Sequence, residues 1–403
     1  MLPGAGTRLD SSPAMRRAVL ANARLLDPEG SAPESAALVL EGERIAGILA
    51  PGAAPPRDAE HVDCHGRWLA PGFIDLHHHG RLLFADAASS AASLEGASAS
   101  LLRHGTTAFL PTTVAWPRPE LRERVAELAR VLEDRAIGRG WSGAIPLGIH
   151  LEGPWIRPEM AGAQPRGGIR SWDVEEGREI FDAARGCVRL VTLAPELPGA
   201  SDLLGELARR GIVAALGHSL AGAEAIERAI GEGLRHVTHV FNAMGGIHHR
   251  ERGTAAVALA DDRLSCDLIC DGAHVHPEIV RVAARAKGDR LLLISDGVDL
   301  PSSGTASFGS GLLASDGVAL RLPDGRLAGS CLTLDRAVRN LRAFAGTSLR
   351  DSVAACTLRP ARLLGIEAER GTLRRGARAD LVVLDETVRP VQTWLSGRCV
   401  WAG

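Results

Sequence analysis

Histidines and acidic residues follow several short apolar runs of this sequence, each at the point where the run ends. His77 and His79 close FIDLHHHG, and Glu152 closes GIHLEGP. The runs AALGHS, HVTHV and LLISDG supply His218, His239 and Asp296. Imidazole and carboxylate are the side chains that bind Zn²⁺ and similar divalent ions at neutral pH. The sequence therefore predicts a divalent-metal site with a further carboxylate beside it.

The spacing within the first motif supports this prediction. Side chains of an extended chain alternate between two faces, so His77 and His79 are expected on one side and His78 on the other. His150, two residues before Glu152, is a candidate to support that carboxylate from behind.

Strand-like and helical runs alternate through the middle of the chain and must position these residues. The expected helices include 121–132, 202–210, 221–230 and 279–287. The expected strands are 72–76, 106–111, 145–151, 188–193, 212–216, 236–240, 264–270 and 291–295. Eight such alternations predict an α/β fold, a (β/α)8 TIM-type barrel whose strand ends share one catalytic face. A doubly wound open sheet is the alternative, although no GxGxxG or Walker loop follows the first strand.

Both ends of the chain show short apolar runs separated by Gly, Pro and Asp, a pattern typical of strands and tight turns. We therefore expect a small β-sandwich domain assembled from residues 1–70 and 371–403. The metal-dependent hydrolase barrel is expected to occupy residues 71–370.

The composition limits the possible partners. The 46 Lys and Arg against 48 Asp and Glu give a net charge of −2, so neither nucleic acid nor a membrane surface is an expected partner. The seven cysteines form no CxxC pair and no disulfide framework, which favours a reducing, cytoplasmic location. Lys287 is the only lysine and lies in a charged helical stretch, so we expect it to be solvated and not to take part in catalysis.

Longer motifs carry a resemblance to a known family. APGFIDLHHHG, HLEGPWIRPEMAGA, LGHS, THVFNAM with RERG, DGAHV, SDG and AGSCLTLDRAVRN resemble the amidohydrolase superfamily and, within it, the N-acetylglucosamine-6-phosphate deacetylases. The resemblance implies metal-dependent hydrolysis of the N-acetyl amide of a phosphorylated amino sugar, which gives the amine and acetate. Ser330 or Thr333 is expected to cap the helix that AGSCLTLDRAVRN begins.

The resemblance also implies roles for individual residues. Glu152, His218 and His239 match the principal metal ligands, and His77 and His79 match a pair that holds a second ion in some relatives. One or two ions are therefore expected, Zn²⁺ first and Fe²⁺ as the alternative. Asp296 matches the catalytic aspartate. The positions that match sugar-phosphate contacts are Asn242, Ala243, Arg250 and His274. In relatives Arg250 and His274 cross a subunit interface, which implies a homodimer.

One position departs from the family pattern. Gln164 stands where relatives carry a histidine that contacts the substrate near its reacting carbonyl, and glutamine can donate a hydrogen bond but cannot carry a proton. The sequence leaves the hexosamine open, including N-acetylgalactosamine-6-phosphate. A deaminase, a cyclic-imide hydrolase, a dipeptidase or a non-catalytic sugar-phosphate sensor are the remaining alternatives.

Overall fold

Parallel strands form the centre of the molecule. The computed structural model describes residues 16–30, 35–80, 90–136, 141, 143–299, 305–308 and 311–403. Six strands pair in parallel in the order β14-β13-β12-β11-β10-β9 and form a half-barrel. Their bounds are β9(Ile149–Glu152), β10(Val188–Leu193), β11(Val213–Leu216), β12(Leu234–Val237), β13(Ser265–Ile269) and β14(Leu291–Ile294). A second parallel sheet contains β6(Phe73–His78), β7(Thr106–Pro111) and β8(Ile145–Pro146).

The two parallel sheets meet at both edges through main-chain hydrogen bonds. At one edge the Asp296 N–H donates to His77 O over 2.9 Å, and the His79 N–H donates to Gly297 O over 2.8 Å. At the other edge the Thr113 N–H donates to His150 O over 2.9 Å. The carboxyl ends of β6, β7, β9 and β14 therefore lie at the same end of the molecule.

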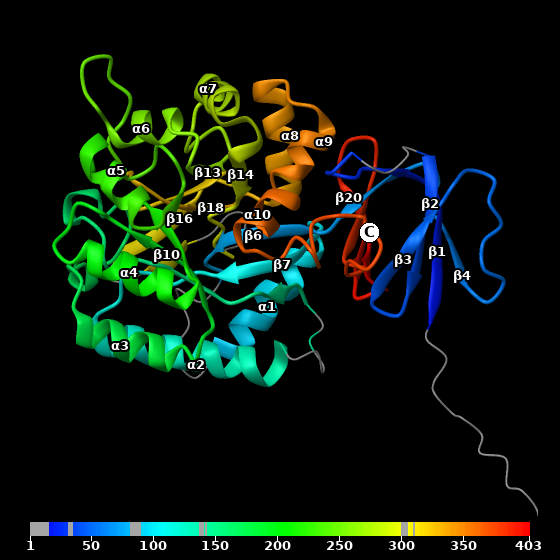
Figure 1. Cartoon of the computed structure of the whole chain (residues 1–403), viewed down its shortest axis with the longest axis horizontal. Helices are drawn as coiled ribbons and strands as arrows, with labels where there is room; N and C mark the ends of the chain where they lie inside the picture. The colour runs from blue at the N-terminus through cyan, green and yellow to red at the C-terminus, as the bar shows by residue number, and fades with distance from the viewer. Residues whose placement is uncertain are drawn as a thin grey trace, which may run out of the picture.

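Helices cover the outside of these strands (Figure 1). They are α1(Ser90–Leu102), α2(Arg118–Ala136), α3(Val174–Ala183), α4(Ala200–Arg210), α5(Ala223–Gly231), α6(Thr254–Ala260), α7(Pro277–Lys287), α8(Leu334–Ala345), α9(Leu349–Ala354) and α10(Leu358–Leu363). β14, with the sequence LLLI, is apolar on both faces because helices and core cover both sides. In α4, Leu203, Leu204 and Leu207 face the core while Arg209 and Arg210 stand at the carboxyl end.

Strands from both chain ends share one eight-stranded sheet, on the right of Figure 1. They are β1(Arg17–Leu25), β2(Ser35–Glu41), β3(Arg44–Leu49), β4(Glu60–Asp63), β5(Trp68–Pro71), β19(Leu381–Leu384), β20(Pro390–Leu395) and β21(Arg398–Ala402). The join between the two ends is β5, which pairs in parallel with β1 and antiparallel with β19. Leu20, Leu38, Leu381 and Trp394 belong to a core cluster separate from that of the parallel strands.

A four-stranded antiparallel sheet, which the sequence analysis did not foresee, follows β14. It contains β15(Thr305–Phe308), β16(Gly311–Ser315), β17(Ala319–Arg321) and β18(Leu327–Ser330). The expectation that Ser330 caps a helix is wrong, because Ser330 ends β18 and its hydroxyl donates to Ser295 O over 2.5 Å. Thr333 is the residue before α8, and its side chain makes no capping hydrogen bond.

The structure changes the expectation for Lys287. Lys287 is buried rather than solvated, because its ammonium group donates to Ala258 O over 3.0 Å and to Asp261 O over 2.7 Å. All seven cysteines are free, as expected.

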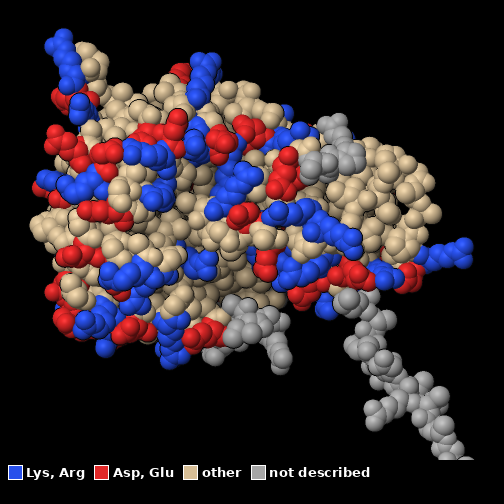
Figure 2. All heavy atoms as spheres, in the orientation of Figure 1, with Lys and Arg blue, Asp and Glu red and all other residues tan. Residues whose placement is uncertain are grey.

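No helix in the described part of the chain is long and apolar enough to cross a membrane. On the face shown in Figure 2, basic and acidic side chains are interspersed.

Candidate metal centre and active-site pocket

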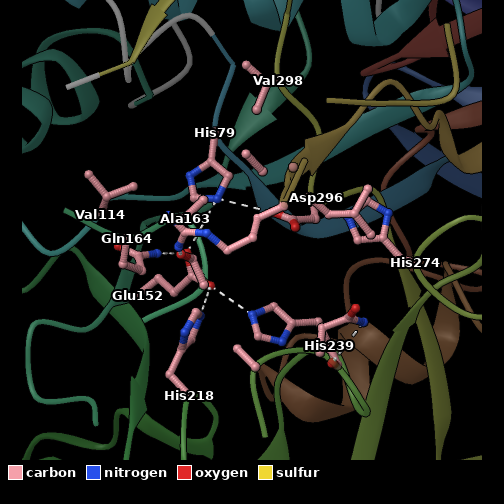
Figure 3. A pocket seen from close by; sticks show the side chains of 17 residues that line it. His79, Val114, Glu152, Ala163, Gln164, His218, His239, His274, Asp296 and Val298 are labelled. Atoms are coloured by element: carbon pink, nitrogen blue, oxygen red, sulfur yellow. Dashed lines mark hydrogen bonds and ion pairs between the residues drawn. The ribbon is translucent and has the colours of Figure 1, made fainter. Parts of the chain in front are cut away.

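The strand ends bring the predicted ligand residues together, and Figure 3 shows four of them, His79, Glu152, His218 and His239. Glu152 is the last residue of β9. His77 lies in β6, and His79 is the first residue after that strand. His218 and His239 each stand two residues beyond their strands, β11 and β12. All five side chains are buried, as expected for groups that must exclude water from an ion. His78 faces the opposite side, where its Nδ1 lies 3.2 Å from Ser295 Oγ.

The backbone turns sharply at three of these strand ends. His218, His239 and Asp296 adopt positive φ angles of 48°, 33° and 48°. Side chains other than glycine rarely occupy this left-handed region, and residues held there concentrate at functional sites. The turn ends each strand and directs the side chain into the space above the sheet.

Glu152 lies between two groups of histidines. Its Oε1 is 3.0 Å from His218 Nε2 and 2.9 Å from His239 Nε2. Its Oε2 is 3.5 Å from His77 Nε2 and 3.4 Å from His79 Nε2. The two oxygens of one carboxylate therefore face two separate pairs of imidazole nitrogens.

Protein carbonyls fix which imidazole nitrogen carries the proton. His218 Nδ1 lies 2.7 Å from Met160 O, and His79 Nδ1 lies 3.1 Å from Thr112 O. A carbonyl only accepts, so Nδ1 must donate in both rings. Nε2 then faces the carboxylates, and in the neutral ring it would be the nitrogen free to bind a metal. This orientation of histidine by a main-chain acceptor is usual at metal sites.

The electrostatics of the cluster suit a cation. Burial alone would raise the pKa of Glu152, but the charge of His77 and hydrogen bonds from His218 and His239 lower it well below its usual value. Burial opposes the charged form of His239, yet its bond to Glu152 raises the pKa to about 9. Protons on the imidazoles thus balance the buried carboxylate. A divalent ion would supply that charge instead, because histidine binds metals through a neutral nitrogen.

The donor atoms fit a metal in two overlapping groups. Glu152, His218 and His239 form one group, and Glu152 with His77 and His79 forms the other. Within each group the donor atoms lie within 4.8 Å of one another. Each group would offer an ion two nitrogens and one oxygen, and three protein ligands are the number that catalytic rather than structural zinc sites provide.

Asp296 stands beside the second group. Its Oδ1 lies 3.3 Å from His77 Nε2 and 3.1 Å from His79 Nε2. Burial alone would raise the pKa of Asp296, but the charge of His77 and the hydrogen bond from His79 lower it to about 2. The carboxylate is therefore ionised at neutral pH and can accept a proton.

A pocket of about 260 Å³ opens above the cluster. Its other lining residues from the described chain include Val114, Gly162, Ala163, Gln164, Asn242, Ala243, His274, Val298, Arg326 and Leu327. Four of the expected substrate residues thus lie in the wall, and Asp296 and Glu152 lie at the base. The sequence predicted that these residues lie together, but it gave none of the distances between them.

Gln164 makes two hydrogen bonds to the protein. Its Oε1 accepts from the Ala115 N–H over 2.8 Å, and its Nε2 donates to Glu152 Oε2 over 2.5 Å. The side chain is 8 % exposed. The first bond fixes which end of the amide points at Glu152, so Gln164 holds the carboxylate oxygen that faces His77 and His79.

The two residues expected from across a subunit interface lie in different places. His274 lines the pocket of its own chain, where its Nδ1 lies 2.6 Å from Asp271 Oδ2, and this corrects the expectation that it enters from a partner. Arg250 is exposed on the segment between β12 and α6 and is not among the residues that line this pocket.

Several supporting residues were missed by the sequence analysis. Asp75 Oδ1 accepts from the N–H groups of His77 and Ser295, each over 3.2 Å, and so ties the end of β6 to that of β14. Asp267 accepts from the His239 N–H. His150, which was proposed as a support, is buried with its Nε2 2.8 Å from Thr192 Oγ1 and its ring against His77.

Arg326 is a charged pocket residue that the sequence analysis missed. It follows the turn Pro323-Asp324-Gly325 between β17 and β18, and a Pro-Asp-Gly sequence between two short runs is a recognised hairpin signal. That signal locates the turn. It does not show that the turn reaches a pocket made by strands far away in the sequence.

Comparison with known proteins shows the family. The model of the amidohydrolase family matches residues 68–400. The chain belongs to the amidohydrolase family. Members of this family are metal-dependent, in agreement with the two donor groups.

Named relatives narrow the resemblance. The chain is 36 % identical over 395 residues to N-acetylglucosamine-6-phosphate deacetylase of Homo sapiens, which covers 94 % of this chain and 90 % of the relative. It is 32 % identical over 383 residues to N-acetylgalactosamine-6-phosphate deacetylase of Escherichia coli O157:H7, which covers 94 % and 98 %. The expected resemblance to the N-acetylglucosamine-6-phosphate deacetylases is confirmed.

Solved structures of deacetylases share the fold. N-acetylglucosamine-6-phosphate deacetylase of Pasteurella multocida superposes with a TM-score of 0.87 at 26 % identity, covering 96 % of this chain and 100 % of the other. A mutant of the Mycobacterium smegmatis enzyme in complex with N-acetyl-D-glucosamine-6-phosphate superposes with a TM-score of 0.85 at 30 % identity, covering 96 % and 99 %.

Proposed function

We propose that this protein hydrolyses the N-acetyl amide of N-acetylglucosamine-6-phosphate and releases glucosamine-6-phosphate and acetate. The observation that carries the proposal is the convergence of Glu152, His218, His239 and Asp296 at the base of one pocket. The named relatives, which cover most of this chain, support the choice of substrate.

Glu152, His218 and His239 would hold the principal ion, and His77 and His79 with Glu152 would hold a second. A divalent ion there lowers the pKa of water toward about 7, so that hydroxide is available at neutral pH. The nitrogen-rich donor set favours Zn²⁺, with Fe²⁺ as the alternative.

Asp296 moves the proton. Its ionised carboxylate accepts the proton of the attacking water and returns it to the amide nitrogen, which must leave as an amine. Asp296 Oδ1 lies 3.3 Å from His77 Nε2 and 3.1 Å from His79 Nε2, so the carboxylate stands directly beside the residues that would hold the ions. Attack on the acetyl carbonyl and protonation of nitrogen break the amide C–N bond and form acetate.

Asn242, Ala243 and His274 line the wall of the pocket and would contact the sugar phosphate. Gln164 would contact the substrate only through the second hydrogen of its amide, since one hydrogen already binds Glu152. Its contribution is therefore expected to act mainly through the position of Glu152.

The proposal extends to architecture and assembly. We take the two parallel sheets, which meet at both edges, as one (β/α)8 barrel spanning residues 71–370. Residues 1–70 and 371–403 are then the separate β-sandwich domain. Arg250 is exposed outside its own pocket, so it would reach a substrate phosphate only as part of a homodimer. A cytoplasmic location stays a prediction.

Acetate release from a panel of acetylated amino sugars tests the function. We expect the highest kcat/KM for N-acetylglucosamine-6-phosphate, followed by the galactosamine isomer. A higher kcat/KM for the isomer would reassign the hexosamine, as the E. coli relative allows. Release of ammonia without acetate would show a deaminase, and binding without turnover would show a sensor.

A further inference from the structure

The pocket contains one permanently charged cation that the family resemblance did not supply. Of the described residues that line it, only Arg326 is a lysine or arginine. The other charged groups near the base are the carboxylates of Glu152 and Asp296 and the imidazoles of the histidines. A phosphate dianion entering this pocket therefore meets one guanidinium that is positive at every pH of interest.

Arg326 bonds to another residue that lines the pocket. Its Nη1 donates to Gly162 O over 2.5 Å, across 164 residues of sequence. Gly162 lies directly against the metal side of the pocket, because a Cβ placed on it would be 3.5 Å from His218 Cε1 and 3.7 Å from Ala243 Cβ. The guanidinium is thus held near Ala243, one of the positions expected to contact the sugar phosphate.

The remaining donors of Arg326 suit an anion. Asp324 accepts from Nε over 2.8 Å and approaches Nη2 at 2.7 Å. A guanidinium carries five N–H donors in a plane, so two remain after the bonds to Asp324 and Gly162. The side chains of Arg326 and Asp324 are each about half exposed. An exposed ion pair of this kind contributes little stability, so Asp324 does not compete strongly with a phosphate for the guanidinium.

We propose that Arg326 binds the phosphate of the substrate from within the same chain, and that the hairpin of β17 and β18 therefore determines the preference for phosphorylated sugars. This inference rests on the proposed function. It differs from the role expected for Arg250, which requires a partner subunit, because Arg326 already lies in the pocket of its own chain.

Kinetics with paired substrates test the assignment. Arg326→Ala removes charge-assisted hydrogen bonds, so kcat/KM for the phosphorylated sugar should fall roughly 10- to 100-fold, mainly through KM. The kcat/KM for the unphosphorylated sugar should fall far less, so that the ratio between the two sugars changes. Arg326→Lys, which keeps the charge but loses the planar fork, should give an intermediate loss.

Arg321→Ala is the matched control. Arg321 lies on the same hairpin and pairs with Asp316 at 3.6 Å, but it does not line the pocket. The change in net charge is the same, so Arg321→Ala should leave both kinetic constants unchanged. The inference is overturned if Arg326→Ala keeps the wild-type ratio between the two sugars, or if Arg321→Ala alters that ratio equally.

Titration with inorganic phosphate separates this inference from the proposed function. Phosphate should bind wild-type protein and Arg321→Ala alike, and at least about 10-fold more weakly to Arg326→Ala. This measurement needs no turnover, so it tests Arg326 even if wild-type protein releases no acetate. Equal phosphate affinity in wild type and Arg326→Ala, with cooperative unfolding retained in both, would reject the assignment.

Discussion

The side chains of the candidate metal centre extend from the ends of buried parallel strands, whereas the rim of the pocket consists of the β17–β18 hairpin and the connecting loops. Glu152 and the four histidines are held by main-chain bonds between strands and by carbonyl acceptors such as Met160 O. Arg326 is held by one exposed carboxylate and one carbonyl. The bonds of the first region fix the positions of the charged side chains. The second region can change without moving those side chains.

This difference predicts separable effects of mutation. Substitutions at the strand ends should abolish metal binding or chemistry for every substrate. Substitutions at the rim should change which substrate is preferred and leave metal content intact, except at Gln164, which donates to Glu152. The changes below test that separation, beginning with the largest expected effect.

Glu152→Ala should remove metal from both donor groups and abolish acetate release. The reason is that each oxygen of Glu152 faces a different histidine pair, so one truncation destroys both groups. Elemental analysis of the purified protein measures the loss. His65→Ala, at an exposed position far from the cluster, is the control and should keep wild-type metal content.

Asp296→Asn should lower kcat on the order of 10²- to 10⁴-fold, because the amide cannot accept the proton of the attacking water. Metal held by Glu152, His218 and His239 should be retained, since Asp296 is not a member of that group. Near-wild-type turnover by this variant would reject Asp296 as the base.

Gln164→Ala should weaken metal binding more than Gln164→Glu. The Glu carboxylate could still accept from the Ala115 N–H, and its negative charge beside Glu152 Oε2 would attract a divalent ion and offset the lost amide donor. Loss of a bond that orients a ligand typically costs 10- to 100-fold in metal affinity, and we expect Gln164→Ala in about that range. Metal titration compares both variants with wild type, and a wild-type affinity in Gln164→Ala would show that the donor to Glu152 is unimportant.

Arg250→Ala should have a smaller effect than the changes above, confined to the phosphorylated sugar, because Arg250 is exposed and outside its own pocket and can act only in that of a partner subunit. In a homodimer, the partner's Arg250 would bind the substrate phosphate in the pocket of the other subunit. Mixing Arg250→Ala with Asp296→Asn subunits should then restore activity on the phosphorylated sugar. Each mixed dimer would contain one pocket that has both an intact Asp296 and an intact Arg250 of the partner subunit. A mixture no more active than its components would contradict a shared site.

The strand-end residues could be predicted because two local signals coincide. Apolar runs of strand length mark where each strand ends, and the residue types that bind metals follow immediately, as in GIHLEGP and AALGHS. Parallel strands place those ends at one edge whatever the sequence between them. The four helices expected from apolar spacing also formed, as α2, α4, α5 and α7.

The rim could not be predicted in the same way. Arg326 reaches Gly162 through a tertiary contact that no periodicity encodes, and Ser330 pairs with β17 in a sheet instead of beginning a helix. Lys287 looked solvated beside Arg285, but the carbonyls of the α6 end accept its ammonium group. His274 belongs to its own chain's pocket, which only the fold could show.

Metal removal tests the central claim most directly. Acetate release from N-acetylglucosamine-6-phosphate should be lost when the protein is dialysed against a chelator, and it should return on addition of Zn²⁺ in proportion to the metal bound. Full turnover by protein with no detectable divalent metal would contradict the role of Glu152, His218 and His239.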